Sequence, residues 1–282
     1  MLEITPPPPN ILCFYEGPSN YAAALRARGV PALDTRAYLV MHHNTKTGAV
    51  LGLVVAPKDA HNFWETRRAG EEPGVCGACP LQSAHSPLPG NGQCYVANGS
   101  RVGHGVTAWL TRGVALPICS PGDVRRMLRR STVLRSAVWG DAAALPPRVW
   151  TSLAKQCEAT GRPVLGYTHG HLLLGYDGIA HLKATHVISA ETVEDALRAR
   201  AEGWRTFRVQ QPGLRPEKGE FRCPAATERG HKIECGECLA CGSVGNEQGR
   251  GSAVIWNHSM QGRAGTRRVF KAQTEALLVQ HL

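Results

Sequence analysis

The chain has 282 residues, of which 43% are hydrophobic and 6% aromatic, and its formal net charge is +10. This composition is that of a globular chain long enough to bury a full core, and it excludes a wholly disordered protein. No apolar run reaches the length of a membrane span, and the N-terminus lacks the pattern of a signal peptide, so we expect a cytoplasmic protein with no membrane partner. The positive charge predicts attraction to nucleic acid or to anionic substrates.

Residues 11–68 are predicted to form mainly strands, with two helices. A strand is expected at residues 11–15 and a helix at residues 21–28. Residues 36–42 and 49–55 flank a polar loop, and this pattern predicts a β-hairpin. Residues 62–68 predict a short helix.

A regular alternation of strands and helices begins at residue 121, where a basic amphipathic helix is predicted over residues 121–130. Strands are then predicted at residues 134–139, 163–167, 185–189, 204–209 and 253–256. Helices are predicted from Pro146-Pro147 to Gly161, at residues 191–202 and at residues 267–278. The βαβ order predicts parallel, neighbouring strands, so the expected fold is a single α/β domain over residues 1–282, built as a parallel (β/α) barrel or partial barrel.

Two irregular segments interrupt this pattern, at residues 69–105 and 210–251, and together they contain most of the ten cysteines. Disulfides are rare in a reducing compartment, so clustered cysteines indicate metal or iron–sulfur ligands. Cys13, Cys119 and Cys157 stand alone and carry no assigned role. We therefore expect both segments to be metal-binding loops.

The C-terminal cysteines have the spacing C-x11-C-x2-C-x2-C and comprise Cys223, Cys235, Cys238 and Cys241. Four thiolates this close can surround one zinc ion or anchor one four-iron cluster. His258 and His231 are additional ligand candidates if the metal is zinc.

The N-terminal cysteines have the spacing C-x2-C-x14-C and comprise Cys76, Cys79 and Cys94. Three thiolates leave one coordination position open, and catalytic metal sites need such a position. In the alternative, His85 or His104 supplies a fourth ligand and the site is purely structural.

Polar residues follow the predicted strands at their carboxyl ends, where α/β folds place their chemistry. Gly140-Asp141 follows the strand at residues 134–139, and the next strand ends in the cluster Thr168-His169-Gly170-His171. Asp141, His169 and His171 are the catalytic candidates, and the candidates for cofactor binding are Gly140, Asp141, Thr168, Ser189 and Arg208. In the alternative, Asp141 only caps the following helix.

These residues resemble radical S-adenosylmethionine enzymes, in which three cysteines bind a [4Fe-4S] cluster and a Gly-Gly-acid motif holds the cofactor. Cys94 is followed by the aromatic Tyr95, Gly140-Asp141 corresponds to the acid motif, and Thr168-His169-Gly170 resembles the Thr-x-Gly turn. The family's usual C-x3-C-x2-C spacing is absent. The chain also resembles uncharacterised cysteine-rich proteins of actinobacterial phages. The resemblance implies an iron–sulfur enzyme that uses S-adenosylmethionine. The positive charge of the chain suggests nucleic acid or a nucleobase as its substrate.

A rival resemblance is to zinc-containing guanine transglycosylases, which exchange bases in tRNA or DNA on a TIM barrel. Cys235, Cys238, Cys241 and His258 are similar to their zinc ligands, and Asp141, or less well Asp177, would be the nucleophile. A third hypothesis is a non-enzymatic, zinc-stapled protein that binds nucleic acid through basic residues such as those of helix 121–130.

Overall fold

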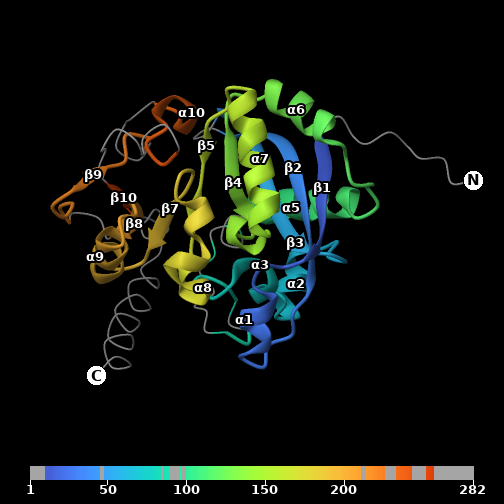
Figure 1. Cartoon of the computed structure of the whole chain (residues 1–282), viewed down its shortest axis with the longest axis horizontal. Helices are drawn as coiled ribbons and strands as arrows, with labels where there is room; N and C mark the ends of the chain where they lie inside the picture. Colours follow the sequence, from blue (N-terminus) through green and yellow to red (C-terminus); the bar gives the residue numbers. More distant parts are fainter. Residues whose placement is uncertain are drawn as a thin grey trace, which may run out of the picture.

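Two five-stranded sheets form the framework of the computed structural model (Figure 1). Sheet A has the strand order β1-β2-β3-β4-β5, and sheet B has the order β6-β7-β8-β10-β9. The structure describes residues 10–44, 48–83, 85–88, 94, 96, 100–210, 214–225, 233–242 and 252–256. None of the helices within these ranges combines the length and apolar composition needed to span a bilayer.

Sheet A is antiparallel at one edge and parallel at the other. Its strands are β1 (Ile11–Pro18), β2 (Asp34–Asn44), β3 (Gly48–Pro57), β4 (Leu134–Trp139) and β5 (Val164–Leu165). The first three pair antiparallel, and the expected hairpin is confirmed as β2–β3. The pairs β3–β4 and β4–β5 are parallel. The mixed α/β class is thus confirmed, and closure into a barrel stays a prediction.

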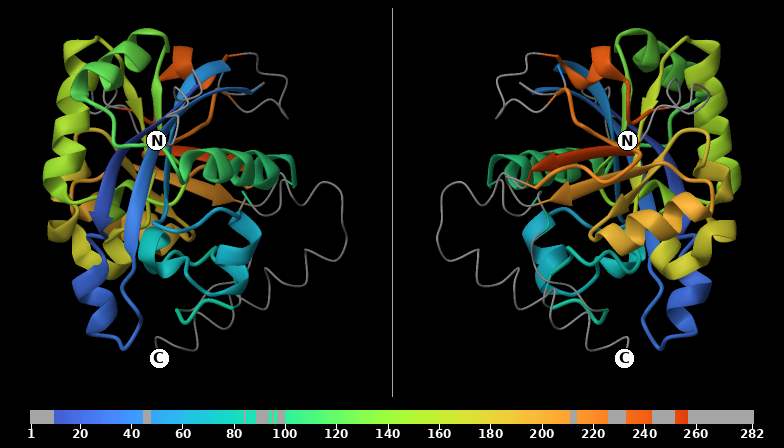
Figure 2. Two further views of the ribbon diagram at one scale, coloured as in Figure 1. Left: turned by 90° about the vertical axis from the view of Figure 1, so that its right-hand side faces the viewer. Right: turned by 90° about the vertical axis from the view of Figure 1, so that its left-hand side faces the viewer.

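Both faces of sheet A are apolar, so helices cover each of them (Figure 2). Leu39, Leu51 and Leu53 pack in one buried cluster with residues of α1 (Ala22–Arg26), α6 (Pro121–Arg129) and α7 (Pro147–Ala159). Side chains that alternate with these, such as Tyr38 and Val54, pack with residues of α2 (Phe63–Arg68) and α5 (Ser100–Gly113). This alternation follows from the period of two along a strand.

Strand β4 contains a bulge next to the catalytic candidates. Its pairing with β3 shifts between Gly52 and Val54, and Ala137 has φ 62°, which is unusual for a residue with a side chain. Ser136, in the same bulge, contacts Nε2 of the buried His186 at 2.8 Å. The bulge therefore connects sheet A to the segment that leads into sheet B.

Sheet B is parallel throughout and begins within a strand that the two sheets share. The strand predicted at residues 163–167 divides at Gly166, because β5 pairs with β4 while β6 (Tyr167–Thr168) pairs with β7 (Val187–Ala190). β7 pairs with β8 (Thr206–Gln210), which pairs with β10 (Ser252–Trp256). The predicted parallel neighbours are confirmed, with this division as the difference. Helix α9 (Val193–Ala201) packs against β7 and β8.

Several elements were absent from the prediction. The segment at residues 69–105 contains α3 (Pro73–Cys76) and the beginning of α5, and α8 (His171–Gly178) and η2 (Ala180–Leu182) follow β6. The segment at residues 210–251 contains β9 (Glu220–Arg222) and α10 (Cys235–Cys238). The expected helix at residues 267–278 lies outside the described residues.

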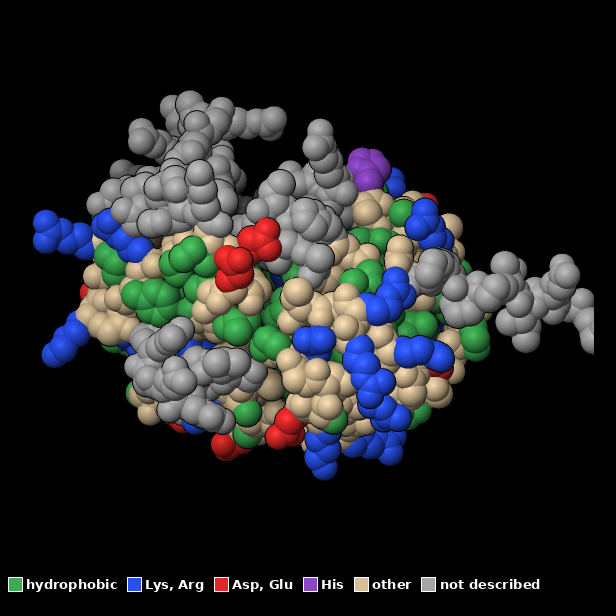
Figure 3. Space-filling view, turned by 90° about the horizontal axis from the view of Figure 1, so that it is seen from above, with side chains coloured by type: hydrophobic (Ala, Val, Ile, Leu, Met, Phe, Trp, Pro, Cys, Tyr) green, Lys and Arg blue, Asp and Glu red, His purple; other side chains and the backbone are tan. Residues whose placement is uncertain are grey.

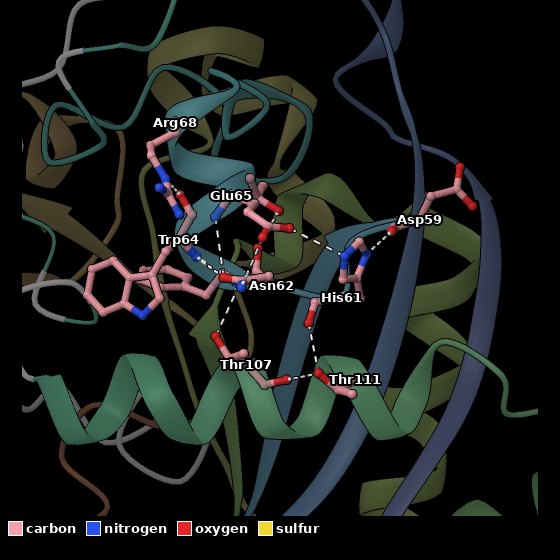
Figure 4. Close-up of polar contacts among 10 residues, drawn as sticks. Asp59, His61, Asn62, Trp64, Glu65, Arg68, Thr107 and Thr111 are labelled. Carbon is pink, nitrogen blue, oxygen red and sulfur yellow. Dashed lines mark hydrogen bonds and ion pairs between the residues drawn. The ribbon is translucent and has the colours of Figure 1, made fainter.

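Helix α2 is held against α5 by polar contacts (Figure 4). The side chain of Asn62 caps the helix by accepting a hydrogen bond from the backbone N–H of Trp64 at 2.9 Å. The Thr107 hydroxyl of α5 accepts from the first N–H of α2 at 3.2 Å, and the Thr111 hydroxyl donates to the carbonyl of His61 at 2.9 Å. These contacts fix α2, which in turn positions the first cysteine segment.

Candidate functional site

Three acidic or basic side chains follow three parallel strands. Asp141 comes after β4, His169 after β6 and Glu191 after β7. The backbone N–H of His169 donates to the Asp141 carboxylate at 2.8 Å, and Nε2 of His169 lies 3.0 Å from a carboxylate oxygen of Glu191. The expectation that Asp141 and His169 lie close in space is confirmed. The carboxyl ends of the strands therefore form one polar site.

Asp141 is almost wholly buried, and the protein itself supplies several donors to its carboxylate. Oδ1 accepts from the N–H of Ala143 at 2.9 Å and from the Thr168 hydroxyl at 2.8 Å, while Oδ2 accepts from the N–H of His169. Burial raises the pKa of Asp141, and these hydrogen bonds oppose the rise. The contact with Ala143 caps η1 (Ala142–Ala144) and not α7, the helix at the prolines that the alternative had it cap. In addition, Asp141 ties the end of β4 to the end of β6.

Gly140 allows the chain to turn from β4 into this site. Its φ of +77° lies in the left-handed region, which favours glycine. A Cβ at this position would also clash with the carbonyl oxygen of Val55 on the neighbouring strand β3. The glycine predicted to bind a cofactor therefore has a conformational role.

The first cysteine pair lies against the end of β4. The backbone N–H of Asp141 donates to the carbonyl of Val75 at 2.7 Å, and Val75 immediately precedes Cys76. Cys76, the last residue of α3, and Cys79 are both partly exposed. The loop that contains the C-x2-C pair thus meets the predicted acid motif at the same edge of the sheet.

The surroundings of Cys76 contain the other members of its predicted group. Burial raises the pKa of the Cys76 thiol well above its ordinary value, and Glu72, Cys79, Cys94 and Asp141 raise it further through their charges. These charge interactions mean that the three thiols and the Asp141 carboxylate lie within electrostatic range of one another. In the absence of a cation they keep Cys76 protonated, since a thiolate there would face several negative groups.

His169 contacts the second cysteine of the pair as well as Glu191. Burial alone would lower the pKa of His169, but its contact with Cys79 and its hydrogen bond to Glu191 raise that pKa well above the ordinary value. The His169 side chain is 12% exposed and that of Glu191 is 23% exposed. These contacts favour the charged form of the imidazole, which lies between Cys79 and the carboxylate of Glu191.

A buried ion pair supports the cysteine loop from the side of α2. Arg67 and Glu72 are 2.7 Å apart, and their side chains are 9% and 1% exposed. The other oxygen of Glu72 accepts from the N–H of Ser83 at 2.7 Å, and the Ser83 hydroxyl donates to the carbonyl of Arg67. The loop from Cys76 to Ser83 is thus closed at its base by Glu72.

His171 lies at the start of α8, next to this network but outside it. Its ring stacks on Tyr176 with centroids 5.2 Å apart, and its Nδ1 is buried without a hydrogen-bond partner. Burial, with His169 and Arg198 nearby, lowers the pKa of His171 to about 4. A neutral imidazole with an unused nitrogen is able to accept a proton or bind a ligand.

The remaining candidates lie in sheet B or on α8. Arg208 forms a bidentate ion pair with Glu220, with N–O distances of 2.9 and 2.6 Å, and also contacts Gln210. This guanidinium is 5% exposed, so in the structure it joins β8 to β9. Ser189 is partly buried in β7, where its backbone is paired with Phe207. Asp177 is exposed on α8.

The C-terminal cysteines gather on one face of sheet B. Burial raises the pKa of the Cys241 thiol to about 12, and the charges of Cys223, Cys235 and Cys238 contribute. Arg205 donates to the carbonyls of Ala240 at 2.7 Å and Gly242 at 2.9 Å. The four cysteines therefore occupy one region, and the hydrogen bonds of Arg205 hold this region against the sheet.

No three His, Cys, Asp or Glu side chains within the described ranges are placed as ligands of a single metal ion. The donor chemistry nevertheless fits a thiophilic metal, because each group brings thiols within electrostatic range of one another. His85 and His104 are exposed. His258 and His231 lie outside the residues that the structure describes.

Three residues of the site were missed from the sequence: Tyr21, Glu72 and Glu191. Glu191 could have been found, since it follows a predicted parallel strand just as Asp141 does. Glu72 and Tyr21 carried no such signal, because their proximity to the site depends on tertiary packing of α1 and α3.

No protein-family model, curated protein or solved structure matches this chain.

Proposed function

We propose that the protein is a metal-dependent enzyme whose metal centre is held by Cys76, Cys79 and Cys94 beside the Asp141–His169–Glu191 network. The observation that carries this proposal is convergence. The C-x2-C pair and the acid at the end of β4 are distant in sequence, yet the N–H of Asp141 bonds to the residue before Cys76. Thiolates beside polar groups at strand ends are the arrangement that a catalytic metal needs.

The preferred metal centre is an iron–sulfur cluster that acts with S-adenosylmethionine. The cluster would supply an electron to the bound cofactor. Metal binding would draw the three thiols closer together, as is usual when a site forms with its metal. Asp141 holds His169 in place, and its proposed contact with the amino group of the cofactor adds to that role. The substrate that we propose is nucleic acid or a nucleobase, which the positive net charge of the chain favours.

Anaerobic purification followed by iron, sulfide and zinc analysis tests the proposal. We expect iron and sulfide in the wild-type protein, their loss from the N-terminal site in Cys79→Ser, and retention in Cys119→Ser, which changes a lone cysteine. The reduced wild-type protein should cleave S-adenosylmethionine. Zinc without iron would overturn the iron–sulfur proposal and favour base exchange or a non-enzymatic zinc protein. Absence of any metal in protein prepared with iron and zinc present would overturn the metal centre itself.

A second candidate function is acyl transfer with Cys79 as the nucleophile, because Cys79 contacts His169 and Glu191 orients that histidine. In this reaction the thiol would give its proton to the imidazole and form a bond to a carbonyl carbon. The bond from that carbon to the leaving group would break, with the imidazolium giving its proton to the leaving group, and water or another nucleophile would then take the acyl group from the sulfur. This function needs no metal.

Alkylation by iodoacetamide in the presence of a chelator distinguishes the two candidates. A nucleophilic Cys79 should react faster than Cys119, and Glu191→Gln should slow that reaction. Equal rates at both cysteines would exclude the nucleophile.

A further inference from the structure

A buried hydroxyl without a partner lies beside the first cysteine pair. Tyr21 is 0% exposed, and its hydroxyl has no hydrogen-bond partner. A buried polar group left unpaired lowers stability, and such groups in native proteins often mark a function. Tyr21 is therefore the residue in the site with the least structural explanation.

The backbone fixes Tyr21 to the loop that contains Asp141. The N–H of Asn20 donates to the carbonyl of Ala144 at 2.7 Å, and the Asn20 side chain donates to the carbonyl of Ala143 at 3.0 Å. Both acceptors belong to η1, which the Asp141 side chain caps. The phenol is thus positioned by the same turn that positions the acid.

The hydroxyl end of the ring lies against the turn between the two cysteines. A Cβ added to Gly77 would be 2.9 Å from Cζ of Tyr21, the carbon that bears the hydroxyl. Gly77 also has φ +60°, so a glycine satisfies both the backbone conformation and the close approach. Burial raises the pKa of Tyr21 well above its ordinary value, and the charges of Asp141, Cys76 and Cys79 raise it further. A phenolic O–H is a hydrogen-bond donor, so the hydroxyl is able to donate to an acceptor in this turn.

We propose that the Tyr21 hydroxyl donates a hydrogen bond to the metal-bound thiolate of Cys76 or Cys79. The inference rests on the proposed metal centre. The hydroxyl has no hydrogen-bond partner among the described residues. A metal-bound cysteine sulfur is a strong acceptor, and hydrogen bonds to such sulfurs stabilise and tune a metal centre. Tyr21 is a positioning residue in this scheme.

The chain offers a matched control in Tyr38. Its hydroxyl is also buried and makes no hydrogen bond of normal geometry, although the Arg36 side chain interacts with it, and the residue belongs to the second core cluster on the other face of sheet A. Tyr38→Phe therefore removes the same atom from a cluster that packs against Cys94, whereas Tyr21 and Cys76 belong to the cluster on the opposite face of the sheet.

The test is anaerobic titration of the metal-free protein with Co²⁺, followed by thiolate-to-cobalt absorption. The Cys79→Ser protein supplies the signal of the C-terminal cysteines, which is subtracted. We expect Tyr21→Phe to weaken Co²⁺ binding at the N-terminal group about ten- to a hundredfold, the range of hydrogen bonds to charged groups. Tyr38→Phe should bind like the wild type. The melting temperature of metal-free Tyr21→Phe should be unchanged or higher, because an unpaired polar atom is removed.

Unchanged Co²⁺ affinity in Tyr21→Phe would overturn this inference and leave the metal centre standing. A lower melting temperature of the metal-free variant would show that the hydroxyl has a structural partner, which also overturns it. If the wild-type protein gives no signal above Cys79→Ser, the metal centre fails and the role of Tyr21 fails with it.

Discussion

The two cysteine groups share one ligand chemistry but differ in their surroundings. Cys76 and Cys79 lie beside Asp141, His169 and Glu72, so the first group has charged neighbours, while Cys76 and Cys94 also pack against the two core clusters of sheet A. Cys241 instead packs with apolar residues, namely Val187, Ala253, Tyr167, Phe207 and Phe221. Polar convergence at strand ends is expected of a reactive centre, and apolar burial is expected of a structural one.

The C-terminal group also connects the two sheets. An isolated bridge joins Leu165 of sheet A to Gly242, and the N–H of Gly166 donates to the carbonyl of Cys241 at 3.4 Å. Arg205, which precedes β8, binds the carbonyls on either side of Cys241. A metal shared by Cys223, Cys235, Cys238 and Cys241 stays a prediction, and in this position its role would be structural.

The largest expected effect is at Asp141, on which the polar region depends. Asp141→Ala leaves the Thr168 hydroxyl and the N–H groups of Ala143 and His169 without their acceptor. We expect a loss of about 3–5 kcal/mol in the free energy of unfolding, measured by urea denaturation. Asp177→Ala, at an exposed position, should change it by less than about 0.5 kcal/mol. A small effect at Asp141 would mean that the network does not hold β4 to β6.

Serine substitutions test directly whether the surroundings of the two cysteine groups differ. In chelator-treated protein, Cys241→Ser places a hydroxyl among apolar side chains and should cost about 2 kcal/mol in unfolding free energy. Cys79→Ser, in polar surroundings, should cost less than about 1 kcal/mol. Thermal and urea unfolding of the two variants measure the difference. Equal losses would contradict the contrast between a structural and a reactive group.

The buried His186, which contacts Ser136 of sheet A and immediately precedes β7 of sheet B, should make the stability depend on pH. Burial, with His181 nearby, lowers the pKa of His186 to about 3. Below the unfolded pKa of about 6.5, the unfolded chain binds a proton that folded His186 excludes. This histidine should therefore lower the unfolding free energy by up to about 1.4 kcal/mol per pH unit as the pH falls from about 6.5 toward 3. His186→Gln should flatten the dependence, whereas substitution of the exposed His61 should not.

The smallest effect on stability is expected on a surface that contains neither cysteine group. Arg125, Arg126, Arg129 and Arg130 are exposed on or just after α6, and Lys and Arg side chains gather on one half of the face seen from above (Figure 3). Arg125→Gln with Arg129→Gln should change the unfolding free energy by less than about 0.5 kcal/mol but weaken binding to a DNA oligonucleotide. Arg26→Gln with Arg28→Gln is the matched control. Equal binding by both double variants would exclude α6 as a nucleic-acid surface.

The sequence predicted the elements whose pattern is local. The hairpin β2–β3 and the strand-turn-helix unit from β4 to α7 follow from periodicity, from Gly140 and from the prolines that begin α7. Because parallel strands end at one edge, the proximity of Asp141 to His169 was also predictable. The division at Gly166 was not, since it depends on the ring of His186, which would clash with any Cβ at that position. Tyr21 and Glu72 approach the cysteines only through tertiary packing.

The division of one strand between two sheets has a consequence for expressing parts of this protein. A cut at Gly166 would separate β5 from β6 and leave the two-residue strand β6 at the very end of the second fragment, where it protects the edge of β7 poorly. Unpaired edges of this kind recruit other chains and promote aggregation. The boundary between the sheets is therefore a poor place to cut the chain, even though the two sheets look separable in the strand order. Fragment complementation and domain exchange should instead use connections that leave β5 and β6 together.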